Sequence, residues 1–266
     1  MTSNIRKLKR LVGKSSLNLL IGILTVLLSL LSPGLSHAAT SEEKAKSYFE
    51  EGVELNKQKQ YDEAIEKLTQ AVRWSLETHK YHQALFMTYL VTRRGLKAVE
   101  VYKGLVREFP KSPVVHYWLG RLYLQSRSLD DAAREFGEAT RLALKDDHGW
   151  ISLGHVYYAQ GKDEAATKAY LEANRLAPKV AVVHSGLGNL YLKKNDYPKA
   201  QKEFSEALKI DPDRWDAHAN RGMVLDHMER YAEAAAAYEK ALRLNPSNAG
   251  LRKLLENARK AAGHDF

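Results

Sequence analysis

The fold is decided by a stretch of 34 residues, 147–180, which reads DHGWISLGHVYYAQGKDEAATKAYLEANRLAPKV. Its first half carries apolar and small residues at helical spacing, and its second half repeats that spacing. The residues concerned are Trp150, Leu153, Gly154 and Tyr157, then Ala166, Tyr170 and Ala173. A polar run from Gln160 to Asp163 separates the halves. The stretch therefore predicts two antiparallel helices joined by a short turn.

The same pattern occupies most of the chain. Pro178, Pro212 and Pro246 lie 34 residues apart, and Pro110 lies 68 residues before Pro178. With that period the chain divides, without insertion or deletion, into six blocks: 45–78, 79–112, 113–146, 147–180, 181–214 and 215–248. A period of this size is typical of repeat proteins, in which each unit packs only on its neighbours.

Three positions of the block are restricted in size. Position eight is glycine in five blocks, position twenty is alanine in all six, and position twenty-four is large and apolar. The last set is Leu68, Tyr102, Phe136, Tyr170, Phe204 and Tyr238. Two helices cross closely only where side chains are small, so we expect the glycine and alanine at the crossing and the large side chain beside it.

This pattern resembles the tetratricopeptide repeat family, and the resemblance covers residues 45–248. The family's small residue at position eight, Tyr at eleven, Ala at twenty and twenty-seven, aromatic residue at twenty-four and Pro at thirty-two are nearly all present. The resemblance implies an all-α fold, a right-handed α-solenoid of six tandem helix-turn-helix repeats. Apolar residues recur at helical spacing after the last repeat, so we expect a C-terminal capping helix at 249–262.

Block two departs from the pattern, with Phe86 at position eight and Leu105 at position twenty-seven. We expect its helices to sit further apart and to bend the stack locally. Blocks one and three have Leu76 and Leu144 in place of the terminal proline, which weakens the helix stop without shifting the frame.

Two helix starts are marked by capping residues. Ser112 followed by Pro113 predicts an N-cap and a first helical residue at the start of block three. Thr40 with Glu43 predicts a capping box for the first helix.

Residues 1–38 have the order of a secretory signal peptide. A basic segment precedes an apolar run from Leu17 to Leu31, and Ser36 and Ala38 are the small residues that signal peptidase requires. We expect cleavage after Ala38 and, because a chain without Cys suits it, export to a bacterial periplasm. The alternative is an uncleaved inner-membrane anchor facing the periplasm, although the run is shorter than the about 20 residues of a spanning helix.

Composition and motifs argue against several classes of function. The formal charge of +9 includes five cations of the leader, which leaves 36 Lys and Arg against 32 acids and does not predict nucleic-acid binding. No catalytic motif or cofactor loop is present, and equivalent His residues of successive repeats lie about 8–10 Å or more apart, too far to share a metal. The sequence predicts neither an enzyme nor a cofactor or metal site.

In the tetratricopeptide family, positions two, five, nine and twelve of the first helix line a concave groove. Carried over here, the resemblance implies that partner-binding residues are Phe49, Met87, Tyr117, Arg121, Ile151, His155, Tyr158 and Asn189. Members that grip acidic chaperone C-termini have Lys at five and Asn at nine of one repeat, where block one has Phe49 and Val53. That clamp is missing.

The sequence thus predicts a protein–protein interaction scaffold or adaptor of the bacterial cell envelope, which binds a partner peptide or helix in its groove. An alternative is an uncleaved inner-membrane protein that recruits partners to the membrane. Another is the accessory subunit of an envelope enzyme complex, whose catalytic residues would lie on a different chain. No residue pattern names the partner or an oligomeric state.

Overall fold

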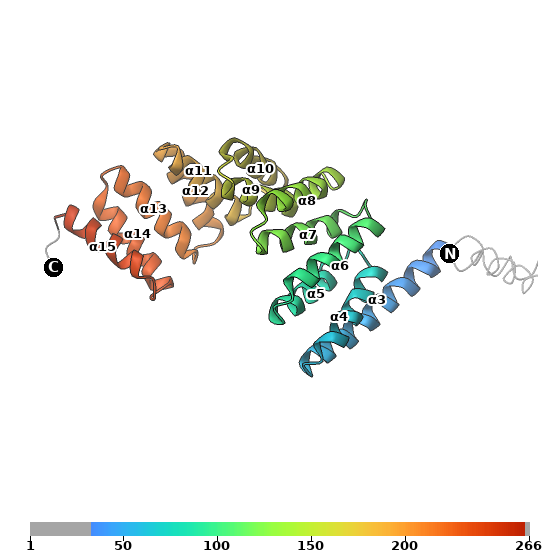
Figure 1. Cartoon of the computed structure of the whole chain (residues 1–266). Helices are drawn as coiled ribbons and strands as arrows, with labels where there is room; N and C mark the ends of the chain where they lie inside the picture. The colour runs from blue at the N-terminus through green and yellow to red at the C-terminus, as the bar shows by residue number, and fades with distance from the viewer. Residues whose placement is uncertain (1–32, 264–266) are drawn as a thin grey trace, which may run out of the picture. The chain divides into compact units, whose positions relative to one another are not determined.

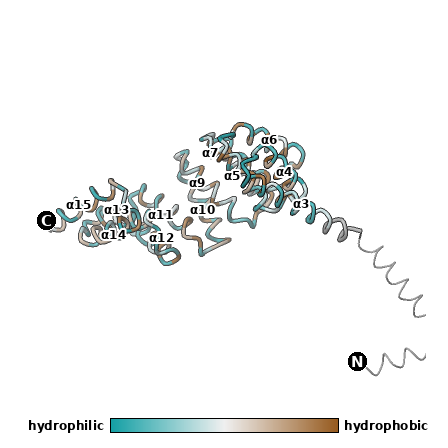
Figure 2. Tube along the Cα trace, turned by 90° about the horizontal axis from the view of Figure 1, so that it is seen from below, coloured by the Kyte–Doolittle hydropathy of each residue, from teal (hydrophilic) through white to brown (hydrophobic). Residues whose placement is uncertain are grey.

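The computed structural model describes residues 33–263, and within them the secondary structure consists of the helices α3 to α15, with no strand (Figure 1). Hydrophobic and hydrophilic residues alternate along these helices (Figure 2), as expected for helices that pack on one side. The fold is all-α and has the helix-pair repeats of a solenoid, as the sequence predicts.

The helices follow the 34-residue frame. The first helices of the blocks are α3 (Pro33–Lys57), α5 (His79–Val91), α7 (Pro113–Gln125), α9 (Asp147–Ala159), α11 (Ala181–Lys193) and α13 (Trp215–His227). The second helices are α4 (Tyr61–Trp74), α6 (Gly95–Glu108), α8 (Leu129–Leu142), α10 (Asp163–Leu176), α12 (Tyr197–Ile210) and α14 (Tyr231–Leu244). The helices α4 and α8 end at the same frame position as the others, although Leu76 and Leu144 replace proline.

The chain forms two compact units, which divide after Arg93. The first contains α3, α4 and α5, and the second contains α6 to α14 with a final helix, α15 (Ala249–Ala261). The division falls inside block two, the block that carries Phe86. The expected local bend at that block stays a prediction.

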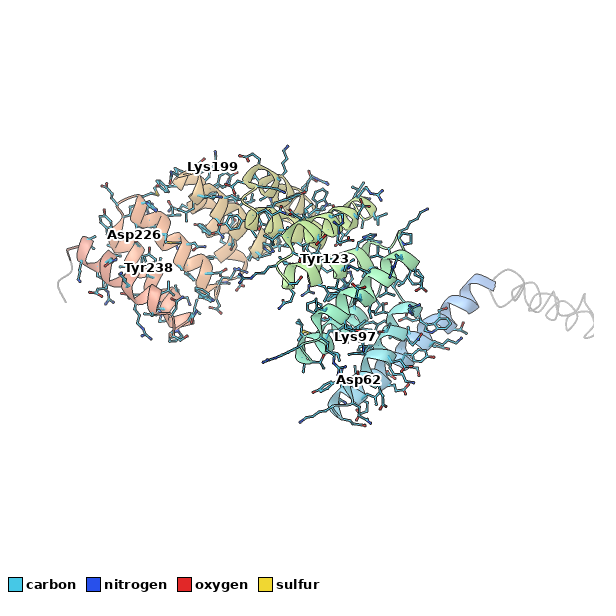
Figure 3. All side chains as sticks on the ribbon, viewed as in Figure 1. Asp62, Lys97, Tyr123, Lys199, Asp226 and Tyr238 are labelled. Carbon is cyan, nitrogen blue, oxygen red and sulfur yellow. The ribbon has the colours of Figure 1, made fainter. Side chains whose placement is uncertain are left out.

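In the five blocks with glycine at position eight, the crossing inside the repeat is built as the small residues predict. A β-carbon added to the glycine at position eight would meet the side chain at position twenty-four at 2.6–2.9 Å, too close for any real contact. The pairs are Gly52 with Leu68, Gly120 with Phe136, Gly154 with Tyr170, Gly188 with Phe204, and Gly222 with Tyr238, whose side chain is labelled in Figure 3. Gly186, which the pattern did not single out, lies equally close to Tyr170 from the next repeat.

The turn between the two helices of a repeat always has the same backbone conformation. Position fifteen takes a positive φ in every block, in Lys59, Arg93, Arg127, Gly161, Asn195 and Glu229. In blocks one and three to six, the next N–H donates to the carbonyl of position eleven, as from Lys162 to Tyr157 at 2.9 Å, which closes a Schellman cap. The left-handed residue is therefore part of the repeat, and four of the six blocks hold a residue other than Gly or Asn there.

The helix α15 continues the frame beyond block six. It starts where a seventh block would start, Asn248 caps it by accepting from the N–H of Leu251 at 3.2 Å, and Gly263 has the positive φ of the turn position. Leu251, Leu255 and Ala258 are buried against α14, and charged side chains face outward. The helix covers the end of the repeat array as the first helix of a repeat would.

The structure corrects one predicted helix start. The helix α3 begins at Pro33, so Thr40 lies inside it and does not cap it; Ser112 does cap α7, by accepting from the N–H of Val115 at 3.3 Å. The predicted cleavage site after Ala38 falls within α3, and the rest of the predicted leader, 1–32, lies outside the described residues. Among the described helices, none is long and apolar enough to cross a membrane.

Candidate interaction surface

The first helices of successive repeats touch one another in the second unit, α9 against α11 and α11 against α13. We call the side chains at positions two, five, nine and twelve of the first helices the inner face of each unit. Of the eight predicted contact residues, six lie on the second unit, from α7 to α11, and Phe49 and Met87 lie on the first. Met87, His155 and Tyr158 are exposed, and the other five are partly buried.

On α7, Arg121 is held by aromatic rings. Its guanidinium carbon lies 4.5 Å from the ring centre of Trp118 and 6.0 Å from that of Tyr117. Tyr117 in turn packs 5.6 Å from the ring of Phe136, so part of its surface belongs to the core. Stacking of a planar cation on aromatic rings fixes the orientation of the guanidinium on this face.

On α9, the three predicted residues have different surroundings. Tyr158 is exposed, whereas Ile151 packs against the cluster formed by Tyr170 and Leu187. The His155 ring lies edge-on to Tyr170, with centroids 5.6 Å apart. Although His155 reaches solvent, the protein atoms around it and then the charge of Arg214 lower the pKa of its imidazole. At neutral pH this ring is an uncharged donor and acceptor.

Two residues outside the four inner-face positions, Arg214 and Asn220, contact residues of the inner face and were not predicted from the sequence. Asn220 on α13 donates to Asn189 on α11 at 2.7 Å, and Arg214 donates to Asp216 at 2.7 Å. Arg214 stands in the N-cap position of α13, where Ser, Thr, Asp and Asn are preferred, and makes no side-chain cap. Arg94 and Arg230 also stand in N-cap positions without capping, so no sequence signal distinguishes Arg214.

The side chain at position four joins neighbouring repeats. The Nε2 atoms of four His rings lie 2.8–3.2 Å from the carbonyl oxygen six residues earlier, and the Trp150 indole N–H points to Leu144 in the same way at 3.4 Å. The four rings are those of His82, His116, His184 and His218. These rings are thereby engaged in holding the turn between repeats.

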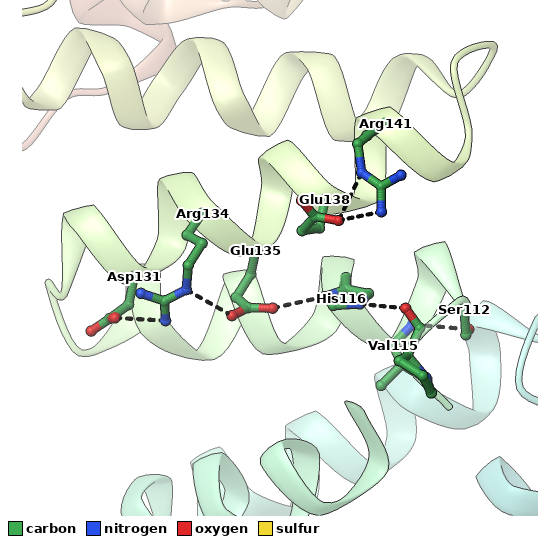
Figure 4. A network of polar contacts seen from close by, with 9 residues as sticks. Ser112, Val115, His116, Asp131, Arg134, Glu135, Glu138 and Arg141 are labelled. Atoms are coloured by element: carbon green, nitrogen blue, oxygen red, sulfur yellow. Dashed lines mark hydrogen bonds and ion pairs between the residues drawn. The ribbon is translucent and has the colours of Figure 1, made fainter. Parts of the chain in front are cut away.

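Two of these His residues, His116 and His184, also contact a carboxylate. In block three, His116 Nδ1 lies 2.8 Å from Glu135, whose other oxygen accepts from Arg134 (Figure 4). With Nε2 donating to the Pro110 carbonyl, both ring nitrogens act as donors, which is the arrangement of an imidazolium. The hydrogen bond to Glu135 raises the pKa of His116, whereas burial lowers the pKa of His82 to about 4.

One group in residues 33–263 has the composition of a metal site. Ligand atoms of Asp146, Asp147 and His148 lie within 4.8 Å of one another at the start of α9. Asp146 Oδ1 already accepts from the N–H of His148 at 3.2 Å, as the N-cap of the helix. The cap accounts for this cluster, and we assign no metal to it.

Comparison with known proteins identifies the family. Tetratricopeptide repeat profiles match residues 84–146 and 186–249 and residues 45–78, and a TPR repeat profile matches 154–195. Together these matches cover more than half of the chain. The chain belongs to the tetratricopeptide repeat family. The comparison with curated proteins gives no match.

Solved structures show the same fold at low sequence identity. The chain is similar to the Cut9–Hcn1 complex of the APC/C (18% identity, TM-score 0.65), with 81% of this chain and 43% of that chain covered. It is similar to PilF of Pseudomonas aeruginosa (16%, TM-score 0.66, 82% and 99% covered). It is also similar to YrrB, described as a TPR protein with an unusual peptide-binding site (18%, TM-score 0.56, 73% and 97% covered). The chain thus spans less than half of the Cut9–Hcn1 chain that it matches.

Proposed function

We propose that the protein is a non-enzymatic scaffold or adaptor of the bacterial cell envelope, which holds a segment of a partner protein on the inner face of its second unit. The family supports interaction with other proteins as the general role. The segment, the envelope location and the choice of residues are the parts that need testing.

One observation carries the proposal: the inner face of α7 and α9 presents Tyr117, Arg121 and Tyr158 on helices whose opposite sides are locked in the core. Arginine and aromatic residues supply most of the binding energy at protein interfaces. Because the helices below them are already ordered, a partner segment would bind without the cost of ordering this surface.

The envelope location rests on the residues before the repeats. The basic segment, the apolar run and the small residues up to Ala38 have the order of a signal peptide. An antibody blot of cell fractions compares the precursor and the mature chain. We expect a chain shortened by about 4 kDa in the periplasmic fraction; a full-length chain in the membrane fraction would instead support the anchored alternative.

The inner face is tested by crosslinking in intact cells, followed by capture of the native chain or of a Tyr117→Ala, Arg121→Glu, Tyr158→Ala variant. Circular dichroism first verifies that the variant is folded. We expect the native chain to capture an envelope protein that the folded variant loses. Capture that survives in the variant would contradict binding at this face.

A further inference from the structure

In blocks three and five, the histidine at position four is bonded by a glutamate at position twenty-three of the same repeat. His116 Nδ1 lies 2.8 Å from Glu135, and His184 Nδ1 lies 2.8 Å from Glu203. The Nε2 atom of each ring lies 3.1 or 3.2 Å from the carbonyl oxygen of the proline that ends the preceding block. A ring between two acceptors donates to both only when both of its nitrogens carry a proton.

Block six has the histidine but not the glutamate. His218 Nε2 lies 2.9 Å from the carbonyl oxygen of Pro212, as in the other blocks. Position twenty-three is Ala237, whose methyl group offers no acceptor to Nδ1 of the ring. Block four also has an alanine there, Ala169, but it has the larger Trp150 at position four. In block six, a histidine opposite an alanine leaves the space that a glutamate takes in blocks three and five.

That space is a cavity of about 230 Å³ between α13 and α14. Its lining residues are His218, Arg221, Glu233, Ala236, Ala237 and Lys240. None of these six stands at position two, five, nine or twelve, so the cavity is separate from the inner face. Pockets for larger ligands have volumes of about 300–1,000 Å³, so this cavity fits a small acid or a single side chain.

The polar lining is mostly basic. The Nε atom of Arg221 is buried without an acceptor in the described part of the chain, and the Lys240 ammonium lies 3.6 Å from Asp213. The Asp213 side chain is 77% exposed, and an ion pair so open to water is weak. Glu233 is already engaged, because Arg230 donates to its two carboxylate oxygens at 2.7 and 2.8 Å. The cavity therefore offers cations that have no carboxylate inside it.

The His218 ring is uncharged at neutral pH. Burial lowers the pKa of its imidazole, and the charges of Lys240 and Arg221 lower it further. The carbonyl of Pro212 and the charge of Asp213 act in the opposite direction without reversing the shift. Because Nε2 donates to Pro212, the neutral ring presents the lone pair of Nδ1. A carboxylate beside Nδ1 would favour the protonated ring.

We propose that this cavity binds a carboxylate from outside the chain, in the place that Glu135 and Glu203 take in their own repeats. One carboxylate oxygen accepts from Nδ1 of His218, which takes up a proton from solvent, and the other lies near Arg221 and Lys240. The carboxylate belongs to a small acid or to an Asp or Glu side chain of a partner protein. The inference goes beyond the proposed function and does not depend on the inner face.

The test uses propionate, which has the atoms of a glutamate side chain beyond the α-carbon, with uncharged propionamide as the matched control. Binding to the purified full chain is followed by NMR of the His218 ring, whose signals are identified by their loss in His218→Gln. We expect saturable propionate binding that becomes about fivefold tighter from pH 8 to pH 6, because the carboxylate and the protonated ring stabilise each other. Absence of binding at pH 6, equal binding of propionamide, or an affinity that does not rise toward pH 6 would each overturn the proposal.

A charge variant tests the basic lining. We expect Arg221→Gln to bind propionate about tenfold more weakly, the effect of losing about 1.4 kcal/mol. The matched control is Arg175→Gln on α10, which makes the same charge change at an exposed arginine paired with Glu172 and should leave the affinity unchanged. Equal affinities of Arg221→Gln and the native chain would contradict the proposed site.

A second pair of variants places the side chain inside the cavity. Ala237→Glu supplies the carboxylate from the chain itself, so we expect the His218 ring to titrate at a higher pH than in the native chain and propionate to be excluded. Ala237→Gln fills the same space without a charge, so it should exclude propionate without raising the His218 midpoint. Circular dichroism verifies the fold of each variant. The same His218 midpoint in both variants would show that a carboxylate at this place does not reach the ring, and would overturn the proposal.

A blocked peptide with one glutamate between alanines separates the two sources of the carboxylate. An affinity about tenfold higher than that of propionate would assign the site to a side chain of a partner protein, and an equal or lower affinity would assign it to a small acid. Either result supports a carboxylate site. Because the two sites share no residue, the crosslinking experiment decides the inner face and propionate binding decides this cavity.

Discussion

The crossing of α11 with α12 and the inner face of α9 place opposite demands on their residues. At the crossing, Gly188 and Phe204 approach so closely that one added carbon would lie 2.7 Å from the ring. On the inner face, Tyr158 is 38% exposed. Close packing therefore restricts the residues at the crossing, whereas the exposed part of the inner face is free of that restriction.

The largest expected effect comes from emptying a crossing. Phe204→Ala removes a fully buried ring from between α11 and α12 and should lower the free energy of unfolding by about 3–5 kcal/mol. Urea unfolding followed by circular dichroism measures it. Tyr158→Ala is the matched aromatic change on the inner face, and we expect it to stay within about 0.5 kcal/mol of the native chain. Similar losses of unfolding free energy in both variants would contradict the distinction between the crossing and the inner face.

The contribution of buried residues can be tested by changing the pH, because His82 and His116 occupy the same position in successive blocks but have different partners. Burial lowers the pKa of His82 to about 4 in the folded chain. Between about pH 6.5 and pH 4, the His82 side chain is therefore protonated in the unfolded chain but neutral in the folded chain. Stability should therefore fall by about 3 kcal/mol between pH 6.5 and pH 4 on account of His82. His82→Gln should lose less stability over this range than the native chain.

His116 should show the opposite sign. Its pKa is raised, so the stabilisation by the imidazolium–Glu135 pair is complete below pH 6.5 and is lost as the pH rises through the folded-state pKa. Histidine titration by NMR should find His82 neutral at pH 5 and His116 still protonated above pH 6.5. The same midpoint for both rings would contradict the assigned role of Glu135.

Filling a crossing should cost less than emptying one. Gly188→Val forces the Phe204 ring out of its place and should destabilise the second unit by about 1–3 kcal/mol. The measurement is the urea midpoint at constant slope. A stability equal to that of the native chain would mean that α11 and α12 can separate freely.

The smallest expected effect is a gain. An added β-carbon at Gly137, in the middle of α8, meets nothing within 4 Å, so Gly137→Ala should stabilise by about 0.5–1 kcal/mol through the lower entropy of the unfolded chain. The shift is measured as a rise in the thermal midpoint. Destabilisation by Gly137→Ala would contradict the distinction between crossing glycines and open ones.

Much of the fold could be predicted because the repeat shows the same constraint several times. A single Gly154 would have meant little, but glycine in five blocks, with a large side chain sixteen residues later, indicates close packing. The N-cap at Ser112 could also be predicted, because it depends only on neighbouring residues. The capping box predicted at Thr40 was wrong, because a capping pair is a weak signal by itself. Helix α3 begins at Pro33 and continues through Thr40.

The inner face could be located by position but not characterised. The frame placed Ile151 and Tyr158 on one helix face, yet only packing decides that Ile151 joins the core and Tyr158 faces solvent. Arg214 and Asn220 were missed because their frame positions are those of a cap and of a packing residue. The contact of Asn220 with Asn189 depends on how α11 and α13 are arranged, and no local pattern records it.

The repeat frame, the helix pairs and the crossings could be derived from the amino-acid sequence, because small and large residues at fixed spacing restrict which backbones can pack. Which side chains remain exposed depends on how the helices pack, since residues that contact Tyr117, Ile151 and His155 lie 15 to 36 positions away along the chain. The tertiary structure also decided the charge of His116 and the cavity beside His218. A pKa or a cavity is made by neighbours in space, and the spacing of residues along the chain does not contain them.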